Sequence, residues 1–207
     1  MKKRILKNTL ILLAVTLVAA LCLSGVYALT KDKIAEAEAK EREESFKAVM
    51  ENVSSFDSIP AEKITRYNEN ARAQSGQNGA EILEARRVLD GSGDFIGVVV
   101  SVVSHKGYGG DVVLSLGVNR DGSISGMKVT SMSETSGLGA NCQDPEWASQ
   151  FAGKKTFPLN YDKSGSPEED EIDAITGATI TTKAVLEAVN AGVDYAVRYM
   201  SDGGASE

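Results

Sequence analysis

The sequence has few of the side chains that perform acid–base or nucleophilic catalysis. It has one histidine, His105, and no GxSxG motif around any serine, so a serine-type catalytic triad has no recognisable basis. Of its two cysteines, Cys22 lies in an apolar run, which leaves the rest of the chain with one thiol and excludes a disulfide there. The neighbours of Cys142 supply no base or positive charge, so we interpret this side chain as unreactive and partly buried.

Basic residues are scarce relative to acidic ones. The chain has 22 lysine and arginine residues against 29 aspartate and glutamate residues. Four of the basic residues lie within residues 1–7. The rest of the chain therefore has 18 basic and 29 acidic residues and a net charge of about −11. Because nucleic-acid binding needs a basic face, DNA and RNA are excluded as partners.

Two further sequence patterns do not match known motifs for nucleotide or metal binding. Three glycines miss the spacing of the dinucleotide fingerprint and follow no βαβ pattern: Gly91, Gly93 and Gly97. An acidic run lacks the alternating ligand spacing of a calcium loop and is interpreted as a solvated loop: Glu168, Glu169, Asp170, Glu171 and Asp173. We therefore predict no metal site.

Charge is absent from residues 8–30, a stretch longer than the roughly 20 residues that span a bilayer. Two interpretations are open, a retained transmembrane helix and a secretory signal cleaved near Ala28. The apolar run exceeds the roughly 7 to 15 residues of a signal sequence, which favours retention. A lipoprotein anchor on Cys22 is less favoured because Leu21 precedes it. In both of the first two interpretations the basic N-terminus (residues 1–7) stays in the cytoplasm and the chain after the apolar run is exported.

The remaining chain predicts an α+β fold. The Ala-, Glu- and Lys-rich segment 31–53 has apolar residues at helical spacing, which indicates a stalk helix, and the polar segment 68–81 is typical of a loop. Runs rich in Val, Ile and Ser over 94–133 indicate antiparallel strands, with a hairpin turn at 119–122. We expect a cytoplasmic N-terminus (1–7), a transmembrane helix (8–30), a stalk helix and polar loop (31–90) and an antiparallel-sheet domain with flanking helices (91–207).

The C-terminal third predicts helices. A short helix is expected after Asp144 as its cap, with Pro145 in its first turn and Gly153 past its end. A brief strand is expected over 155–159. A final amphipathic helix is expected from Thr182 to about Met200, capped by Thr181 or Thr182.

Two glycine clusters flank the predicted strands. KGYGGDV places Tyr108 among three glycines before a strand, and SETSGLGAN follows a strand. Both patterns are consistent with simple turns. They are equally consistent with backbone that comes close to a flat or anionic group, with Tyr108 as a packing ring and Glu134 and Thr135 as polar contacts.

The stretch DAITGATITTKAV precedes the final helix. Free amides and the helix dipole at a helix N-terminus favour a phosphate, and small residues at 177 and 178 leave the Thr179 hydroxyl accessible. That hydroxyl could bind a phosphate or become esterified to one. The alternative is that Thr176 and Thr179 simply cap the helix.

DAITGAT resembles the flavinylation motif of proteins that carry FMN covalently. The resemblance implies that Thr179 is joined to the FMN phosphate through a phosphoester, which a separate Mg-dependent flavin transferase makes from FAD. The two glycine clusters are similar to the other flavin-enclosing segments of the same domain. The expected FMN contacts are Thr179, Asp173, Thr176, Gly177, Ala178 and Thr182 from the motif, Gly107, Tyr108, Gly109 and Gly110 from the first cluster, and Glu134, Thr135, Gly137, Leu138 and Gly139 from the second.

Over nearly its whole length the chain resembles the G-subunit family of the Rnf complex, a membrane-bound, ion-translocating ferredoxin:NAD oxidoreductase. One departure is Ser136, where the family commonly has Pro. The resemblance implies an electron carrier, anchored by one transmembrane helix, whose partners are the other Rnf subunits, including a second flavinylated membrane subunit. The alternatives are the related C subunit of the sodium-translocating NADH:quinone oxidoreductase, another extracytoplasmic electron-transfer chain, and a non-redox binding module tethered to the membrane.

Overall fold

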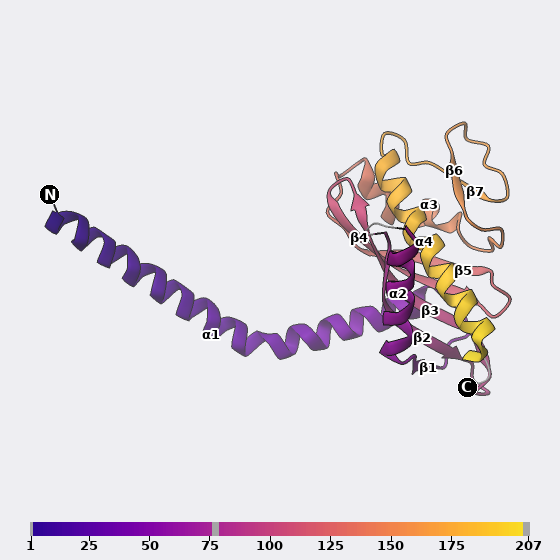
Figure 1. Ribbon diagram of the computed structural model, residues 1–207, viewed down its shortest axis with the longest axis horizontal. Coiled ribbons are helices and arrows are strands. Elements are labelled where there is room, and N and C mark those ends of the chain that lie inside the picture. Colours follow the sequence, from indigo (N-terminus) through magenta and orange to yellow (C-terminus); the bar gives the residue numbers. More distant parts are fainter. Residues whose placement is uncertain (1, 76–78, 205–207) are drawn as a thin grey trace. The chain divides into compact units, whose positions relative to one another are not determined.

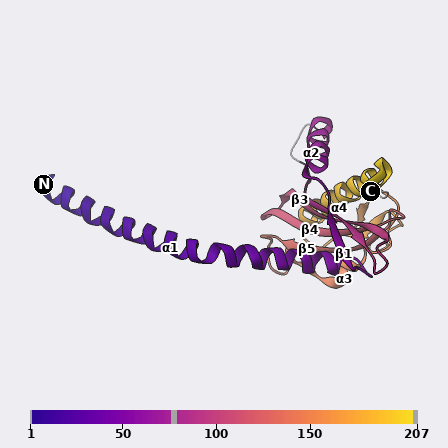
Figure 2. The same cartoon turned by 90° about the horizontal axis from the view of Figure 1, so that it is seen from below.

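The structure is a computed structural model that describes residues 2–75 and 79–204 (Figures 1 and 2). It divides into two units, Met1–Glu43 and Glu44–Glu207. Helix α1 (Lys2–Ala48) makes up the first unit and contributes its last turn to the second. The stretch Lys3–Ala48 is long and apolar enough to cross a membrane, with a mean hydropathy of 2.5 in its most apolar window and none of that window buried. The predicted transmembrane segment 8–30 lies within it.

The second unit is built on a five-stranded antiparallel sheet. Its strands are β1 (Ser55–Ser58), β2 (Glu81–Leu89), β3 (Phe95–Gly107), β4 (Gly110–Asn119) and β5 (Ile124–Ser131), and each pairs with the next in the order of the sequence. The predicted hairpin turn at 119–122 joins β4 to β5, where Asn119 accepts a hydrogen bond from the Gly122 amide at 2.9 Å. The expected antiparallel sheet is therefore confirmed.

Both faces of the sheet are covered, so β3 is buried along most of its length. Val98, Val100 and Val102 belong to the main core with the apolar face of α4 (Thr179–Tyr199). Val99 points to the other face, where Phe46 and neighbouring residues from the end of α1 form a smaller cluster. Figure 2 shows α2 (Ala61–Ser75) and α4 on the same side of the sheet.

The remaining elements are short. They are a 3₁₀ helix η1 (Gly139–Gln143), helix α3 (Pro145–Ser149), two parallel strands β6 (Asn160–Asp162) and β7 (Glu171–Asp173), and a helical turn η2 (Met200–Gly204) that continues α4 at its C-terminal end. As predicted, the Asp144 side chain caps α3 by accepting a hydrogen bond from the Glu146 amide. The α+β prediction is confirmed.

The prediction of a polar loop at 68–81 is wrong over 68–75, which form the second half of α2. Long-range contacts stabilise this polar helix, because Tyr67 donates to Asp194 and Asn68 bonds to the backbone of Ile82. Residues 76–78 of that segment lie outside the described residues.

Strand β2 also falls within 31–90, a range for which the sequence predicts only the stalk helix and the loop. Its buried residues Ile82, Ala85 and Val88 are three apart, so the sequence shows no alternation. A bulge between Ile82 and Glu84 explains the first interval, and the second arises because Ala85 is buried in the main core and Val88 in the smaller cluster on the other face.

Two smaller predictions are also corrected. No strand forms at 155–159, where Pro158 has no amide hydrogen to donate to a ladder; the strand β6 follows it. The final helix begins at Thr179 rather than Thr182, and neither Thr181 nor Thr182 is its cap.

Candidate functional site

Three segments that are far apart in the sequence surround one cavity of about 580 Å³. One is the turn between β3 and β4, one follows β5, and one is the N-terminus of α4 with the loop before it. The lining residues are Tyr108, Glu134, Thr135, Leu138, Gly139, Gly177, Ala178, Thr179, Ile180 and Thr181. Residues from all three predicted motifs therefore face the same space.

Glu134 joins the first two segments. Its carboxylate accepts hydrogen bonds from the amides of Tyr108, at 2.8 Å, and Gly109, at 3.4 Å. The Tyr108 side chain is left 72% exposed at the cavity. The remaining glycines of the turn, Gly107 and Gly110, support this conformation without lining the cavity.

Gly139 lets the second segment approach α4 closely. A Cβ atom at this position would lie 2.5 Å from Glu134 Oε2 and 2.6 Å from Thr181 Oγ1. Such distances are shorter than a carbon–oxygen contact allows. A side chain at this position would therefore displace Glu134 or Thr181 from this packing against the first turn of α4.

The first turn of α4 presents free hydrogen-bond donors to the cavity. Ala178 is the N-cap residue and supplies no side-chain cap, and Gly177 before it has a φ of 75°, which favours glycine. The amides of Thr179, Ile180 and Thr181 have no acceptor among residues 2–75 and 79–204. These amides and the helix dipole form an anion-binding end.

Thr179 is the first residue of α4, and its half-buried side chain lines the cavity. Its hydroxyl makes no hydrogen bond within the described part of the chain, and neither does the exposed hydroxyl of Thr176. The alternative in which these two threonines cap the helix is therefore wrong. The Thr179 hydroxyl is free to react or to bind.

Thr182 lies behind the cavity and holds the loop in place. It is fully buried, accepts a hydrogen bond from the Ile175 amide at 3.0 Å and donates one to the Ala178 carbonyl at 3.0 Å. These bonds close the turn that carries Gly177 and Ala178. In this conformation Thr182 positions the loop rather than facing the cavity.

Three other predicted residues, Gly137, Asp173 and Thr176, line an adjoining cavity of about 640 Å³, and Leu138 borders both cavities. Two hydrogen bonds hold the backbone of Asp173, one from Trp147 in α3 and one to Gln150, which follows α3. The Trp147 indole donates to the Asp173 carbonyl at 2.8 Å, and the Asp173 amide donates to Gln150 at 2.7 Å.

Sequence reasoning missed Ile180 and Thr181 as cavity residues and Trp147 and Gln150 as supports of Asp173. Ile180 is 52% exposed and Leu138 is 44% exposed. With Tyr108 they place three exposed apolar side chains around the cavity. Ile180 is an apolar residue on the exposed side of α4, outside the row of buried residues. An apolar side chain at an exposed helix position is the pattern that could have identified Ile180 as a cavity residue.

The other chemical candidates have structural roles. Cys142 is buried, and this burial, together with nearby Glu134, raises the pKa of its thiol to about 11. Lys154 donates to the carbonyls of Glu168, Glu169 and Glu171 and so holds the acidic loop. His105 bonds to Asp111 at 2.8 Å.

The cavity fits FMN by the chemistry of its walls. The helix N-terminus supplies amides for a phosphate, whereas Tyr108, Leu138 and Ile180 supply apolar surface for a flat ring. The missing side chain of Gly139 allows the wall formed by Glu134 and the first turn of α4 to pack closely. The hydroxyl of Thr179 lies beside the amides of the helix N-terminus.

Comparison with known proteins gives matches over most of the chain. The family model described as FMN-binding domain matches residues 107–194, and the model described as RnfG N-terminal region matches residues 1–49. The G subunit of the Na⁺-translocating ferredoxin:NAD⁺ oxidoreductase complex of Acetobacterium woodii is 31% identical over 193 residues, which are 92% of this chain and 91% of that protein.

A second relative is the G subunit of the ion-translocating oxidoreductase complex of Methanosarcina acetivorans, 28% identical over 194 residues, which are 93% of this chain and 95% of that protein. Among solved structures, the C subunit of the Na⁺-translocating NADH-quinone reductase of Parabacteroides distasonis matches with a TM-score of 0.51 and 21% identity. The match covers 72% of this chain and 78% of that chain, and it shows a shared fold.

Proposed function

Because the chain belongs to the G-subunit family of Rnf-type ion-translocating oxidoreductase complexes, we propose that it carries FMN esterified to Thr179 and passes electrons within such a complex. The observation that carries this proposal is the position of the Thr179 hydroxyl. It lines the cavity, has no hydrogen-bond partner within the described residues and is next to the free amides of the first turn of α4.

The attachment follows from the chemistry of FAD. The Thr179 oxygen forms a bond to the phosphorus on the FMN side of the pyrophosphate, and the bond from that phosphorus to the bridging oxygen breaks. AMP leaves with the bonding electron pair, and the hydroxyl proton passes to a base of the flavin transferase. The small residues Gly177 and Ala178 leave room for the transferase to reach Thr179.

The residues of the cavity then hold the phosphate and the ring. The amides of Thr179, Ile180 and Thr181 lie where they can donate to phosphate oxygens. Glu134 fixes the turn that carries Tyr108, and Leu138 and Ile180 flank the space for the ring. Bound flavin supplies the electron-transfer chemistry, so the protein needs to provide position and burial rather than a general acid or base.

The proposal includes a membrane location. The apolar part of α1 crosses the bilayer, with the basic residues 1–7 in the cytoplasm and Glu44–Glu207 on the other side. A cofactor on that side is lost if it dissociates, and a covalent bond prevents this loss. The partners are the other subunits of the complex, including a second flavinylated membrane subunit, and the flavin transferase.

The proposal is tested by producing the full chain together with a flavin transferase and recording flavin fluorescence after denaturing gel electrophoresis. We expect a fluorescent band from the wild type and none from Thr179→Ala. Thr156→Ala is the matched control, because it removes the hydroxyl of an exposed threonine outside the cavity and should keep the label. A band of undiminished fluorescence from Thr179→Ala would move the attachment to another residue.

A further inference from the structure

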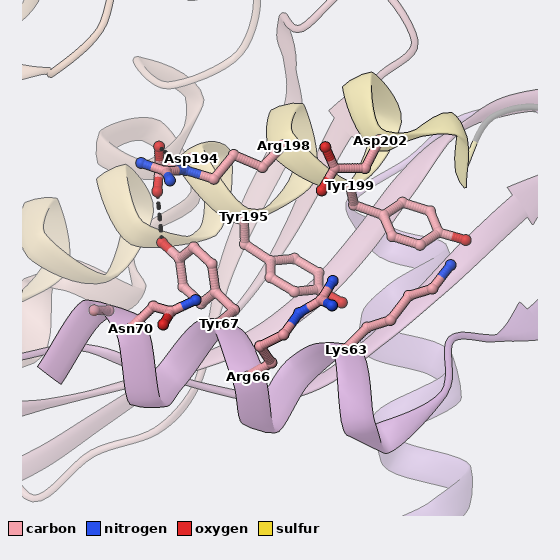
Figure 3. Close-up of a pocket in the computed structure, with 10 residues that line it drawn as sticks. Lys63, Arg66, Tyr67, Asn70, Asp194, Tyr195, Arg198, Tyr199 and Asp202 are labelled. Atoms are coloured by element: carbon pink, nitrogen blue, oxygen red, sulfur yellow. Dashed lines mark hydrogen bonds and ion pairs between the residues drawn. The ribbon is translucent and has the colours of Figure 1, made fainter. Parts of the chain in front are cut away.

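A second cavity, of about 380 Å³, lies between α2 and α4 (Figure 3). Its lining includes Asp194, which is roughly 22 Å along α4 from Thr179 at the helical rise of about 1.5 Å per residue. The two cavities share no lining residue. The second cavity is therefore separate from the candidate flavin site.

Three tyrosine rings form a wall of this cavity. Tyr67 contacts Tyr195 edge to face, with ring centroids 5.2 Å apart, and Tyr195 lies nearly parallel to Tyr199, at 6.4 Å and 11°. Tyr195 and Tyr199 are 3% and 6% exposed, and the Lys63 ammonium lies 5.1 Å from the centre of the Tyr199 ring, so the partly exposed Tyr67 offers most of the open aromatic surface to a planar group.

The hydroxyl of Tyr195 is buried without a hydrogen-bond partner among the described residues, and the whole side chain is 3% exposed. The neighbouring Tyr67 hydroxyl differs, because it donates to Asp194 at 2.8 Å. An unpaired buried hydroxyl costs about 1–3 kcal/mol. Burial also raises the pKa of Tyr195, so its hydroxyl keeps its proton and remains a donor. It would be satisfied by an acceptor that enters the cavity.

The charged side chains of the cavity give a balance of one positive charge, although the chain has a net charge of −7. Its charged residues are Lys63, Arg66, Asp194, Arg198 and Asp202. Asp194 already pairs with Arg198 at 2.9 Å and accepts from Tyr67. Arg66 is exposed and has no partner in the described part of the chain, and Figure 3 shows it extending from α2 toward the Tyr195 ring. An anion that reaches the Tyr195 hydroxyl would therefore lie near the Arg66 guanidinium.

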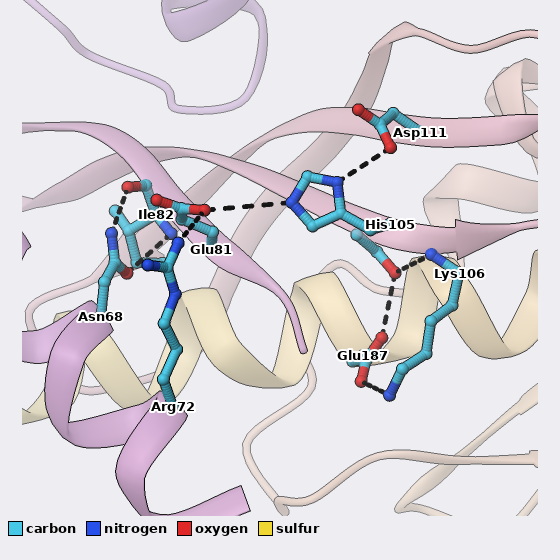
Figure 4. Close-up of polar contacts among 9 residues, drawn as sticks. Asn68, Arg72, Glu81, Ile82, His105, Lys106, Asp111 and Glu187 are labelled. Carbon is cyan, nitrogen blue, oxygen red and sulfur yellow. Dashed lines mark hydrogen bonds and ion pairs between the residues drawn. The ribbon is translucent and has the colours of Figure 1, made fainter. Parts of the chain in front are cut away.

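Both helices of the cavity are tied to the sheet (Figure 4). On α2, the Asn68 amide group makes two hydrogen bonds with the backbone of Ile82, at 2.9 and 3.0 Å, and Arg72 pairs with Glu81 at 2.7 Å. On α4, Glu187 pairs with Lys106 of β3 at 2.5 Å. The walls are therefore held apart in a fixed geometry before any ligand binds.

We propose that this cavity binds a small organic anion that combines a single planar ring with a carboxylate or phosphate. The ring packs on the tyrosine wall, and the anionic group pairs with Arg66 and accepts a hydrogen bond from Tyr195. The volume is at the lower end of the roughly 300–1,000 Å³ of small-molecule sites, which suits one ring and excludes a flavin dinucleotide. This site is distinct from the proposed flavin site and does not depend on it.

The test is isothermal titration calorimetry on the full chain in detergent, without flavin, using four probes. Phenyl phosphate and benzoate carry both a ring and an anion, inorganic phosphate lacks the ring, and benzyl alcohol lacks the charge. We expect one or both of the first two probes to bind at least about tenfold more tightly than either of the others. The comparison of phenyl phosphate with benzoate identifies the anionic group that the site prefers.

Two variants and one control locate the binding. Arg66→Gln and Tyr195→Phe should each weaken binding of the preferred probe by about tenfold, because each removes a hydrogen bond to a charged group. Tyr195→Phe deletes only an unpaired hydroxyl, so it should fold normally. Arg120→Gln, an exposed arginine outside the cavity, should bind like the wild type. Equal binding by all three variants, or no preference for probes that have both ring and charge, would overturn the proposal.

Discussion

The carboxylate of Glu134 accepts a hydrogen bond from the amide of Tyr108 at 2.8 Å, and this contact joins two loops that are 26 residues apart in the chain. The same oxygen also accepts from Gly109. Glu134 therefore sets the distance between the β3–β4 turn and the glycine segment that leads into η1. These are two of the three segments that surround the candidate flavin site.

Replacing Glu134 with alanine should loosen the turn at Tyr108. We expect Glu134→Ala to lower the free energy of unfolding by about 1–2 kcal/mol, because two amides lose a charged acceptor. Urea unfolding of the full chain in detergent, followed by the fluorescence of the single tryptophan, Trp147, measures this change. Glu134→Gln keeps an acceptor oxygen and should have a smaller effect; equal losses in the two variants would argue against the role of the carboxylate oxygen.

Thr182 offers a test of the loop before α4. Thr182→Val keeps the shape of the side chain but leaves the Ile175 amide without its acceptor, so we expect a loss of about 1–3 kcal/mol in the free energy of unfolding. Thr182→Ser keeps the hydroxyl and should retain most of that stability. The same urea titration compares the two, and a valine variant as stable as the serine variant would show that the hydroxyl does not hold the loop.

The close approach at Gly139 predicts that this position does not accept a side chain. Gly139→Ala should destabilise the chain by about 1–3 kcal/mol, because its Cβ collides with Glu134 and Thr181. Gly91→Ala is the matched control, since its Cβ would meet no atom within 4 Å. Thermal unfolding by circular dichroism distinguishes them, and equal melting temperatures would contradict the packing described here.

The raised pKa of Cys142 predicts slow alkylation and a pH effect on stability. In a Cys22→Ser background at pH 8, iodoacetamide should react at least about 100-fold more slowly with the native chain than with the unfolded chain, because the native pKa is about 11 against 9.0. The raised pKa stabilises the native state fully below pH of about 9, and this contribution is lost as the pH rises through about 11. Mass spectrometry of timed samples gives the rates, and equal rates would refute the burial of the thiol.

The sequence predicted the features that depend on local chemistry. Glycine spacing around Tyr108 and the small residues before Thr179 indicated segments that line one cavity, because glycine and helix N-termini have local signatures. The Asn119–Gly122 turn and the Asp144 cap were found for the same reason.

The sequence did not reveal the features that depend on contacts between distant segments. Helix α2 is polar and is held by Asn68 on the backbone of Ile82, a contact that no local pattern indicates. In β2, a bulge and the burial of residues on both faces removed the alternation that would have identified the strand. The support of Asp173 by Trp147 likewise joins residues 26 positions apart.

The intact mass of the full chain, produced together with a flavin transferase and FAD, tests the proposed attachment of FMN most directly. We predict a mass that exceeds that of the polypeptide by one FMN less one water, with the addition on the peptide that contains Thr179. No addition is expected in Thr179→Ala. A wild-type mass equal to that of the polypeptide alone, or an addition on a different residue, would contradict the proposed attachment.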